Sequence, residues 1–301
     1  MTVGLAVVAL VAVSCATARV PGLALAQIAT RSLPEPAKVL VLLPPSYGSS
    51  PQRRYPVLYF LHDGYGNART LESRGVAAAI RARMAAGDLP EFLLVAPGAP
   101  GSWFSDSHDG VHRYEEFLTG DLIKEIEKRY RVLAGKQARA LTGISMGGYG
   151  AFKLALKHPD LYGAVSSLSG ALIPIEWDDL ERYNAFARWT LKRVFGSQRD
   201  DNSLAANDIW VILRSLHFDE PPFAAHLRAG TEDVYGLNGV AAQFGSFLTE
   251  HGLPASVVLE PGGHDWSYWR RAMLPLVQWH GRRFAYDRGD ENREPKLKTE
   301  N

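Results

Sequence analysis

A serine between two glycines is the residue in this sequence best placed to do covalent chemistry. Segment 143–147 reads Gly-Ile-Ser-Met-Gly; it ends an apolar run typical of a strand and opens a stretch with helical periodicity. In a strand-to-helix turn of this kind the serine backbone is strained, its hydroxyl stands above the sheet, and the glycines relieve crowding. The following helix directs its partial positive charge at the hydroxyl. Ser145 is therefore the candidate nucleophile, and the segment matches neither a dinucleotide-binding nor a phosphate-binding loop.

The base that would activate this serine is sought among nine histidines. Hydrolases with this type of turn place serine, acid and histidine in that order along the chain, each after a strand. His264 follows a predicted strand at 257–260 and precedes a predicted helix, so we expect it on a loop at the active edge of the sheet. His251 and His280 fall within or at the end of predicted helices and are interpreted as partly buried surface histidines.

The acid must follow a strand that lies between the serine and the histidine in the sequence. The predicted strand at 225–229 leads into Glu232 and Asp233, two carboxylates that compete for the role. We favour Asp233 and keep Glu232 as its substitute. Asp265 is adjacent to the base in the sequence, so we expect its side chain to point elsewhere, as a solvated or supporting carboxylate.

Nucleophilic attack on a carbonyl group creates a negatively charged oxygen, which two backbone N–H groups must stabilise. Met146 is expected to supply one of them because it follows the nucleophile in the turn. The second is expected from the loop after the predicted strand at 56–61, whose glycines let the main chain approach a substrate oxygen closely. Tyr65 is the preferred donor, with Gly64 next.

Short apolar runs alternate with longer amphipathic stretches between the two ends of the chain. The short runs predict strands at 39–43, 56–61, 92–96, 138–144, 165–168, 225–229 and 257–260. The longer stretches predict helices at 70–86, 114–130, 146–157, 240–251 and 266–284. Because strands and helices alternate, we expect an α/β fold with a mostly parallel central sheet and helices on both faces.

Six segments together resemble the esterase D-type family of the α/β-hydrolases, which includes feruloyl esterases, S-formylglutathione hydrolases and mycolyltransferases. They are His-Asp-Gly at 62–64, Gly-Ser-Trp-Phe-Ser-Asp at 101–106, Tyr-Glu-Glu-Phe-Leu at 114–118, the glycine-rich run at 143–151, Gly-Thr-Glu-Asp at 230–233 and Gly-His-Asp-Trp-Ser-Tyr-Trp at 263–269. The resemblance covers about residues 35–285.

This resemblance implies the α/β-hydrolase fold and assigns roles to five residues of this sequence. Ser145, Asp233 and His264 would form a catalytic triad, and Tyr65 with Met146 would form the oxyanion hole. The chain departs from many relatives in having Asp-Gly at 63–64 where they have His-Gly, which leaves the second oxyanion donor open.

A long insertion before the acid supplies candidate substrate-binding residues. The stretch at about 171–222 exceeds a simple connection and contains an aromatic-rich amphipathic segment, so we expect a helical lid over the nucleophile. Trp177 and Trp189 within it are expected to contact substrate, although an ordinary core-packing helix is the alternative. Trp103 and Trp266 lie in segments beside the site and are further candidates.

Four acidic and histidine side chains lie close together in the sequence, but their pattern does not favour a metal site. They are Asp106, His108, Asp109 and His112. No His-Glu-x-x-His pattern accompanies them, and the segment 103–110 is better interpreted as a wall of the acyl or alcohol pocket. We therefore expect neither a metal nor a cofactor.

Composition and the chain ends limit the domain organisation and the partners. The 301 residues carry a net charge of +1, which provides no global field for nucleic acid, and no linker or repeat divides residues 27–286 into two domains. Residues 1–18 are apolar and uncharged, so a signal peptide and an exported protein, secreted or periplasmic, are expected. Membrane attachment is expected only if Cys15 is lipidated. Residues 287–301 are predicted to be a charged, disordered tail.

The expected activity is that of a serine carboxylesterase that acts through an acyl-serine intermediate and needs no cofactor. Its substrate would be a small-molecule or carbohydrate-linked ester. Two alternatives stay open: an exported acyltransferase that uses a sugar or lipid alcohol, and a catalytically silent relative that only binds a ligand. The sequence leaves the acyl group, the alcohol and the oligomeric state open.

Overall fold

The computed structural model describes residues 20–284 except residue 176, and of residues 177, 179 and 182 it describes only the backbone. The predicted leader at 1–18 and the predicted tail at 287–301 therefore lie outside the described residues. Within the described part of the chain, no helix is both long and apolar enough to cross a membrane.

One eight-stranded sheet runs through the molecule in the order β1-β2-β4-β3-β5-β6-β7-β8. Pairings β1–β2 and β2–β4 are antiparallel, and the remaining pairings are parallel. The predicted mostly parallel α/β sheet is thus confirmed. The strands are β1 (Leu23–Ile28), β2 (Ala37–Leu42), β3 (Val57–Leu61), β4 (Leu93–Pro97), β5 (Arg139–Ile144), β6 (Ala164–Leu168), β7 (Ala224–Gly230) and β8 (Ala255–Glu260).

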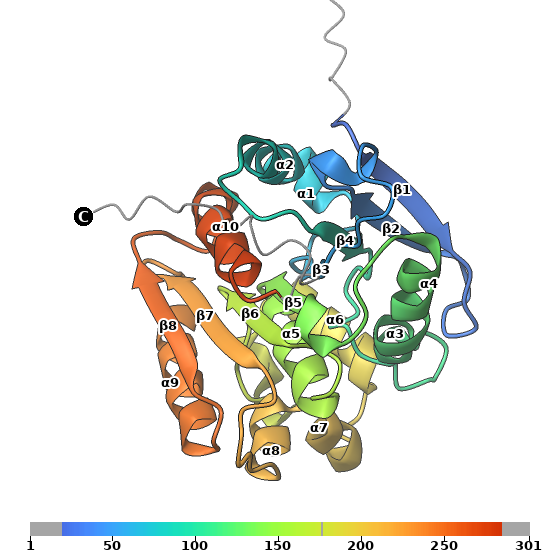
Figure 1. Ribbon diagram of the computed structural model, residues 1–301. Helices are drawn as coiled ribbons and strands as arrows, with labels where there is room; N and C mark the ends of the chain where they lie inside the picture. The colour runs from blue at the N-terminus through green and yellow to red at the C-terminus, as the bar shows by residue number, and fades with distance from the viewer. Residues whose placement is uncertain (1–19, 176, 285–301) are drawn as a thin grey trace, which may run out of the picture.

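Helices cover both faces of this sheet (Figure 1), with α2 and α10 on one face and α4, α5, α8 and α9 on the other. The α-helices are α1 (Thr70–Ser73), α2 (Val76–Ala86), α3 (Tyr114–Glu116), α4 (Leu122–Arg129), α5 (Met146–Lys157), α6 (Ala185–Phe195), α7 (Asp201–Asn207), α8 (Ile209–Arg214), α9 (Leu237–Glu250) and α10 (Trp266–Gly281). Short 3-10 helices occur at η1 (Pro45–Tyr47), η3 (Lys136–Ala138) and η4 (Trp177–Arg182), and a π-helical turn occurs at η2 (Phe117–Asp121).

The alternation of apolar side chains along the central strands places a core on each face of the sheet. In β3, Leu58 and Phe60 pack with α2 and α10, whereas Val57 and Tyr59 belong to the core under α4 and α5. All five residues of this strand are buried. Burial on both faces explains why the strand is a continuous apolar run in the sequence.

Three local features differ from the predicted elements. The strand β1 was not predicted; it pairs antiparallel with β2 at the sheet edge. The predicted helix at 70–86 is two helices, because Gly75 adopts a left-handed conformation with φ of 74° between them. The predicted helix at 114–130 contains the π-helical turn η2 between α3 and α4.

Candidate active site

The turn between β5 and α5 holds Ser145 in a backbone conformation that non-glycine residues rarely adopt. Its φ is 54° and its ψ is −114°. A Cβ atom on Gly143 would lie 2.1 Å from the carbonyl oxygen of Gly147, and one on Gly147 would lie 2.1 Å from that of Leu61. Any side chain at either glycine would therefore force the backbone apart. Both glycines are needed for a turn that is this tight.

Three polar side chains from separate strand ends form one hydrogen-bonded chain. The Oγ atom of Ser145 lies 3.0 Å from Nε2 of His264, and Nδ1 of His264 lies 2.8 Å from Oδ2 of Asp233. The serine follows β5, the aspartate follows β7 and the histidine follows β8. Because these strands are parallel, their carboxyl ends meet at one edge of the sheet. The sequence-predicted residues are thus brought together.

The environment of Asp233 fits a carboxylate that orients an imidazole. Its side chain has no solvent exposure, and its other oxygen, Oδ1, accepts the backbone N–H of Tyr235 at 3.0 Å. Two rings contact the imidazole of His264 edge-on, those of Tyr235 and Trp269, with centroids 4.9 Å away in each case. These contacts fix the ring plane in which a proton would move.

The other acidic residues near the histidine have different positions. Glu232 is exposed, and only its backbone N–H contributes a bond here, to the carbonyl of Gly262. Asp265 is the N-cap of α10, where its Oδ1 accepts the backbone N–H groups of Ser267 and Tyr268. The carboxylate beside the imidazole is therefore that of Asp233.

The two histidines set aside in the sequence have different surroundings. His251 is partly buried, and its Nδ1 lies 2.9 Å from the carbonyl oxygen of Phe247 at the end of α9. His280 has no exposure at all and its Nε2 lies 2.7 Å from Oγ of Ser166, so the interpretation as a surface histidine was wrong. Helix α10 places that position against the sheet, which its single-residue context does not reveal.

The loop after β3, residues 62–66, approaches the nucleophile turn, because a Cβ atom on Gly147 would lie 2.7 Å from the carbonyl oxygen of His62. The N–H of Tyr65, the preferred oxyanion donor, donates to Oδ1 of Asp63 at 3.1 Å. Asp63 is buried, and its Oδ2 has no hydrogen-bond partner among the described residues. The aspartate at the position where the sequence departs from many relatives thus shapes the loop directly.

His62 fixes this loop from inside the molecule. Its Nε2 accepts the backbone N–H of Ala99 at 2.9 Å, so its Nδ1 carries the proton and donates to the carbonyl of Asp63 at 2.7 Å. Complete burial lowers the pKa of His62, which keeps the ring neutral. The neutral tautomer is the one that both bonds require.

Comparisons with known proteins agree with this geometry. The sequence profile of the family described as "Putative esterase" matches residues 30–280. The chain belongs to this esterase family. The family resemblance and the α/β-hydrolase fold expected from the sequence are both confirmed.

Individual relatives match this family member over different lengths. The acetyl esterase of Caldicellulosiruptor saccharolyticus is 26% identical over 74% of this chain and 82% of its own length. Esterase Rv1288 of Mycobacterium tuberculosis is 35% identical over 44% of this chain, and the match spans only 28% of that protein. A solved ferulic acid esterase superposes with a TM-score of 0.68 at 27% identity, covering 87% of this chain and 98% of that one.

The insertion before β7 divides into a core part and a part near the candidate site. Helix α8 belongs to the core, because Ile209 and Leu213 have no exposure. Helix α6 instead lies over the loops that follow β3 and β4: Phe186 stacks on Tyr65, and Thr190 accepts the indole N–H of Trp103 at 2.9 Å. Within the stretch predicted as a lid at 171–222, α8 thus packs into the core, whereas α6 lies beside the loops of the candidate site.

Three of the four tryptophans predicted to bind substrate have described side chains, and each has a different setting. Trp103 is partly buried, with a left-handed φ of 51°, and Trp189 on α6 is 55% exposed. Trp266 is partly buried beside Trp269, whose other neighbour is the imidazole of His264. The side chain of Trp177 lies outside the described residues. Ring contacts connect each of these three side chains to a residue near the candidate site: Trp103 to Tyr149, Trp189 to Phe186, and Trp266 to Trp269.

A buried charge cluster beneath the candidate site was missed by sequence reasoning. Lys153 on α5 is completely buried, and its Nζ donates to Ser105, Glu115 and Asn207 at 2.6, 2.9 and 3.3 Å. Burial lowers the pKa of Lys153, and the nearby carboxylate of Glu115 opposes that shift. The cluster ties the nucleophile helix to the loop after β4 and to α7. A lysine on the apolar side of a predicted helix was the signal that could have indicated it.

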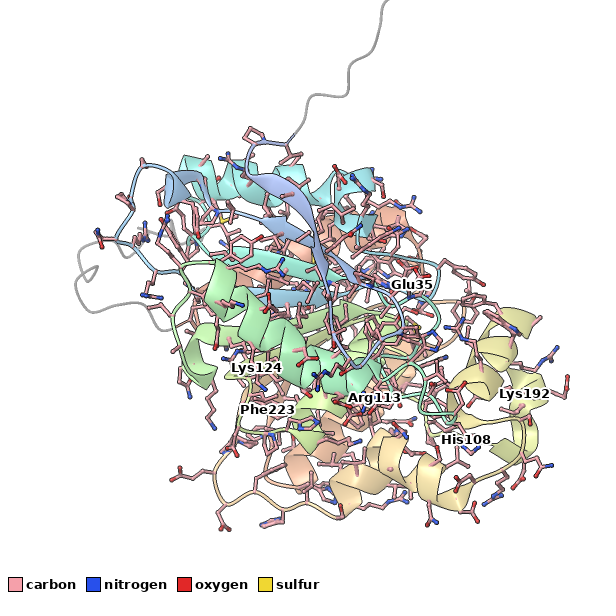
Figure 2. All side chains as sticks on the ribbon, turned by 90° about the vertical axis from the view of Figure 1, so that its right-hand side faces the viewer. Glu35, His108, Arg113, Lys124, Lys192 and Phe223 are labelled. Atoms are coloured by element: carbon pink, nitrogen blue, oxygen red, sulfur yellow. The ribbon has the colours of Figure 1, made fainter. Side chains whose placement is uncertain are left out.

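The acidic and imidazole cluster at 106–112 supports the loop that contains it. Among residues 20–284, residue 176 excepted, no three acidic, histidine or cysteine side chains are grouped as metal ligands. Oδ1 of Asp106 accepts the N–H groups of Glu115 and Glu116. The ring of His108 packs close to Gly196 beyond the end of α6 (Figure 2). These contacts connect the loop to its neighbours.

Proposed function

We propose that this chain hydrolyses carboxylic esters through a covalent acyl intermediate on Ser145. One observation carries the proposal: the hydrogen-bonded chain from Ser145 Oγ to His264 and from His264 to the buried Asp233, with separations of 3.0 and 2.8 Å. A nucleophile, a base within hydrogen-bond reach and a third group that orients the base are the parts that acyl transfer needs. Membership in the esterase family supports the same chemistry.

The first half of the reaction would form the acyl-enzyme. Nε2 of His264 takes the hydroxyl proton of Ser145 as Oγ attacks the ester carbonyl carbon, and the carbonyl oxygen becomes an oxyanion. When this intermediate collapses, the bond to the alcohol oxygen breaks and the imidazolium returns its proton to the departing alcohol. In the second half, a water molecule repeats these steps and releases the carboxylic acid.

Backbone and side-chain charges would stabilise the transient ions of this cycle. The N–H of Met146, the first residue of α5, and an N–H of the loop at 62–66 would donate to the oxyanion. Asp233 holds the imidazole in the tautomer that leaves Nε2 free to accept a proton, and it stabilises the imidazolium. The aspartate needs no proton of its own for this role.

Relatives and exposed aromatic side chains support a small-molecule or carbohydrate-linked ester as the substrate. An acetyl esterase and a ferulic acid esterase are among the similar proteins. Tyr65, Trp189 and Tyr235 are each more than half exposed, and Tyr235 contacts the imidazole of His264, so these rings could contact an acyl or alcohol group. Transfer of the acyl group to an alcohol in place of water would use the same intermediate.

A fluorophosphonate probe and a series of nitrophenyl esters test the proposal. The wild-type chain is expected to react with one equivalent of probe and to release nitrophenol, and the S145A variant is expected to do neither. Turnover of S145A should fall by about 10³-fold or more. Adding an acceptor alcohol would reveal transfer as a second product. A wild-type chain that is folded but unlabelled would contradict the proposal and favour a silent binding protein.

A further inference from the structure

The ring of Phe186, in the first turn of α6, covers the loop from which an oxyanion donor is expected. It stacks on the ring of Tyr65 with centroids 4.3 Å apart and an interplanar angle of 26°. A Cβ atom on Gly64 would lie 3.2 Å from Cε1 of Phe186, so the same ring also covers the preceding residue. Both residues considered for the second oxyanion donor are therefore in contact with one side chain of the insertion. Because the N–H of Tyr65 donates to Oδ1 of Asp63, Gly64 is the remaining candidate donor.

We infer that Phe186 is a positioning residue that holds the loop at 63–66, and with it the second oxyanion donor, in place. The inference rests on the proposed function and assigns this ring a role in the reaction.

Hydrogen bonds hold the loop at 63–66 on the side that faces the protein, and the ring of Phe186 packs against it on the side that faces solvent. Asp63 accepts three of these hydrogen bonds. Its Oδ1 accepts the N–H of Tyr65, and its carbonyl oxygen accepts both the N–H of Gly66, at 2.9 Å, and Nδ1–H of His62. The ring of Tyr65 itself is 74% exposed. Without the stack, the outer side of the loop would face solvent and its backbone would be free to shift.

Helix α6 is anchored firmly enough to act as such a support. Thr190 accepts the indole N–H of Trp103, and Val194 accepts the backbone N–H of His108 at 2.6 Å. Four residues of the helix are buried, namely Thr190, Leu191, Val194 and Phe195. The helix is therefore fixed to the loop after β4, and Phe186 holds a defined position at its first turn.

Oxyanion stabilisation depends steeply on the position of each donor, because the N–H must lie about 3 Å from the developing charge. A displacement of about 1 Å can reduce a rate by up to about 100-fold. A loosely held loop should bind the ground-state ester nearly as well as a fixed one. Loss of the Phe186 stack should therefore lower kcat with little change in KM.

The test compares Phe186→Ala with wild type on nitrophenyl acetate, a small ester whose acyl group cannot fill a large pocket. We expect kcat to fall by about 10-fold and KM to stay within about twofold. Phe186→Tyr, which keeps a ring that can stack, should return kcat to within about twofold of wild type. Lys192→Ala is the matched control, since Lys192 is an exposed residue of the same helix (Figure 2).

The outcomes separate this inference from the proposed function. A wild-type chain that fails to react with the fluorophosphonate probe contradicts the proposed function. A reactive wild type together with a Phe186→Ala variant of unchanged kcat, or one altered only in KM, overturns the positioning role. If Phe186→Ala does not fold, Phe186→Leu, which keeps most of the apolar volume but cannot stack, should still lose kcat about fivefold, and unchanged kcat in that variant would also overturn it.

Discussion

At the scale of single residues, the candidate site depends on side chains whose alternatives lie close by in the sequence. Glu232 and Asp233 are adjacent carboxylates at the end of the same strand, and chain order alone does not choose between them. The structure separates them because the bend after β7 turns one side chain toward His264 and leaves the other exposed. The difference concerns one residue, but it changes which variant should lose activity.

A paired substitution tests this assignment. Asp233→Asn should reduce kcat by about 10³- to 10⁴-fold, because an amide no longer stabilises the imidazolium and favours the wrong tautomer. Glu232→Gln, the matched control one residue away, should keep activity near that of wild type. Initial rates on nitrophenyl acetate at neutral pH provide the measurement. Loss of activity in Glu232→Gln with retention in Asp233→Asn would show that the acid has been assigned to the wrong residue.

At the scale of secondary-structure elements, the strength of the local signal decided what the sequence could predict. The strand β3 is a continuous apolar run and β5 is buried in five of its six residues; both were placed within one residue of their observed bounds. The strand β1 was missed because it contains two alanines and a glutamine, and only its last residue is buried, so pairing with β2 defines it more than its own composition. The break at Gly75 follows from the left-handed backbone of this glycine, with φ of 74°, which helical periodicity alone does not reveal.

Helix α6 offers an element-scale prediction because two of its residues lie on opposite faces. Trp189 is 55% exposed and Leu191 is 2% exposed. Trp189→Ala should change the ratio of kcat/KM between short and bulky esters by about 10-fold, on the order of 1–2 kcal/mol, with little change in Tm.

Leu191→Ala, from the buried face of the same helix, should do the reverse. We expect it to lower the free energy of unfolding by about 2–5 kcal/mol and to leave the ester ratio unchanged. Thermal unfolding and a series of nitrophenyl esters measure both effects. Equal losses on every ester in Trp189→Ala would contradict a role for that ring in substrate selection.

At the scale of the whole molecule, the parallel sheet explains why the site was easier to predict than its surroundings. Residues far apart in the sequence meet at one edge because each follows a parallel strand, and that rule needs only the order of elements. The stack of Phe186 on Tyr65 and the buried pairing of Lys153 with Glu115 depend on the path of an insertion and on packing between helices. The stack has no local sequence pattern, and a lysine on the apolar side of a helix marks only one member of the buried pair, so the partners of each appear only in the folded molecule.

Two buried histidines between the sheet and α10 should make the stability of the whole fold depend on pH. His226 on β7 stacks against Trp279, and His280 lies beside Ser166. Burial, together with the charges of Arg228 and Arg283, lowers the pKa of His226 to about 4, and burial likewise lowers the pKa of His280 well below its usual value. Both rings therefore stay neutral in the folded chain at pH values where exposed histidines are charged.

The sign of the effect follows from proton binding. In the unfolded chain these histidines take up protons as the pH falls through their ordinary pKa near 6.5, whereas folded His226 does so only near pH 4. Between those values the unfolded state binds more protons, so the free energy of unfolding should fall as the pH is lowered, by about 1 kcal/mol per pH unit for each histidine. Urea unfolding of wild type and of His226→Gln at several pH values from 7 to 4.5 measures this dependence, and the comparison removes the contribution of carboxylates common to both. The variant should show a slope smaller by about one proton, and identical slopes in the two chains would mean that His226 is not held neutral by the fold.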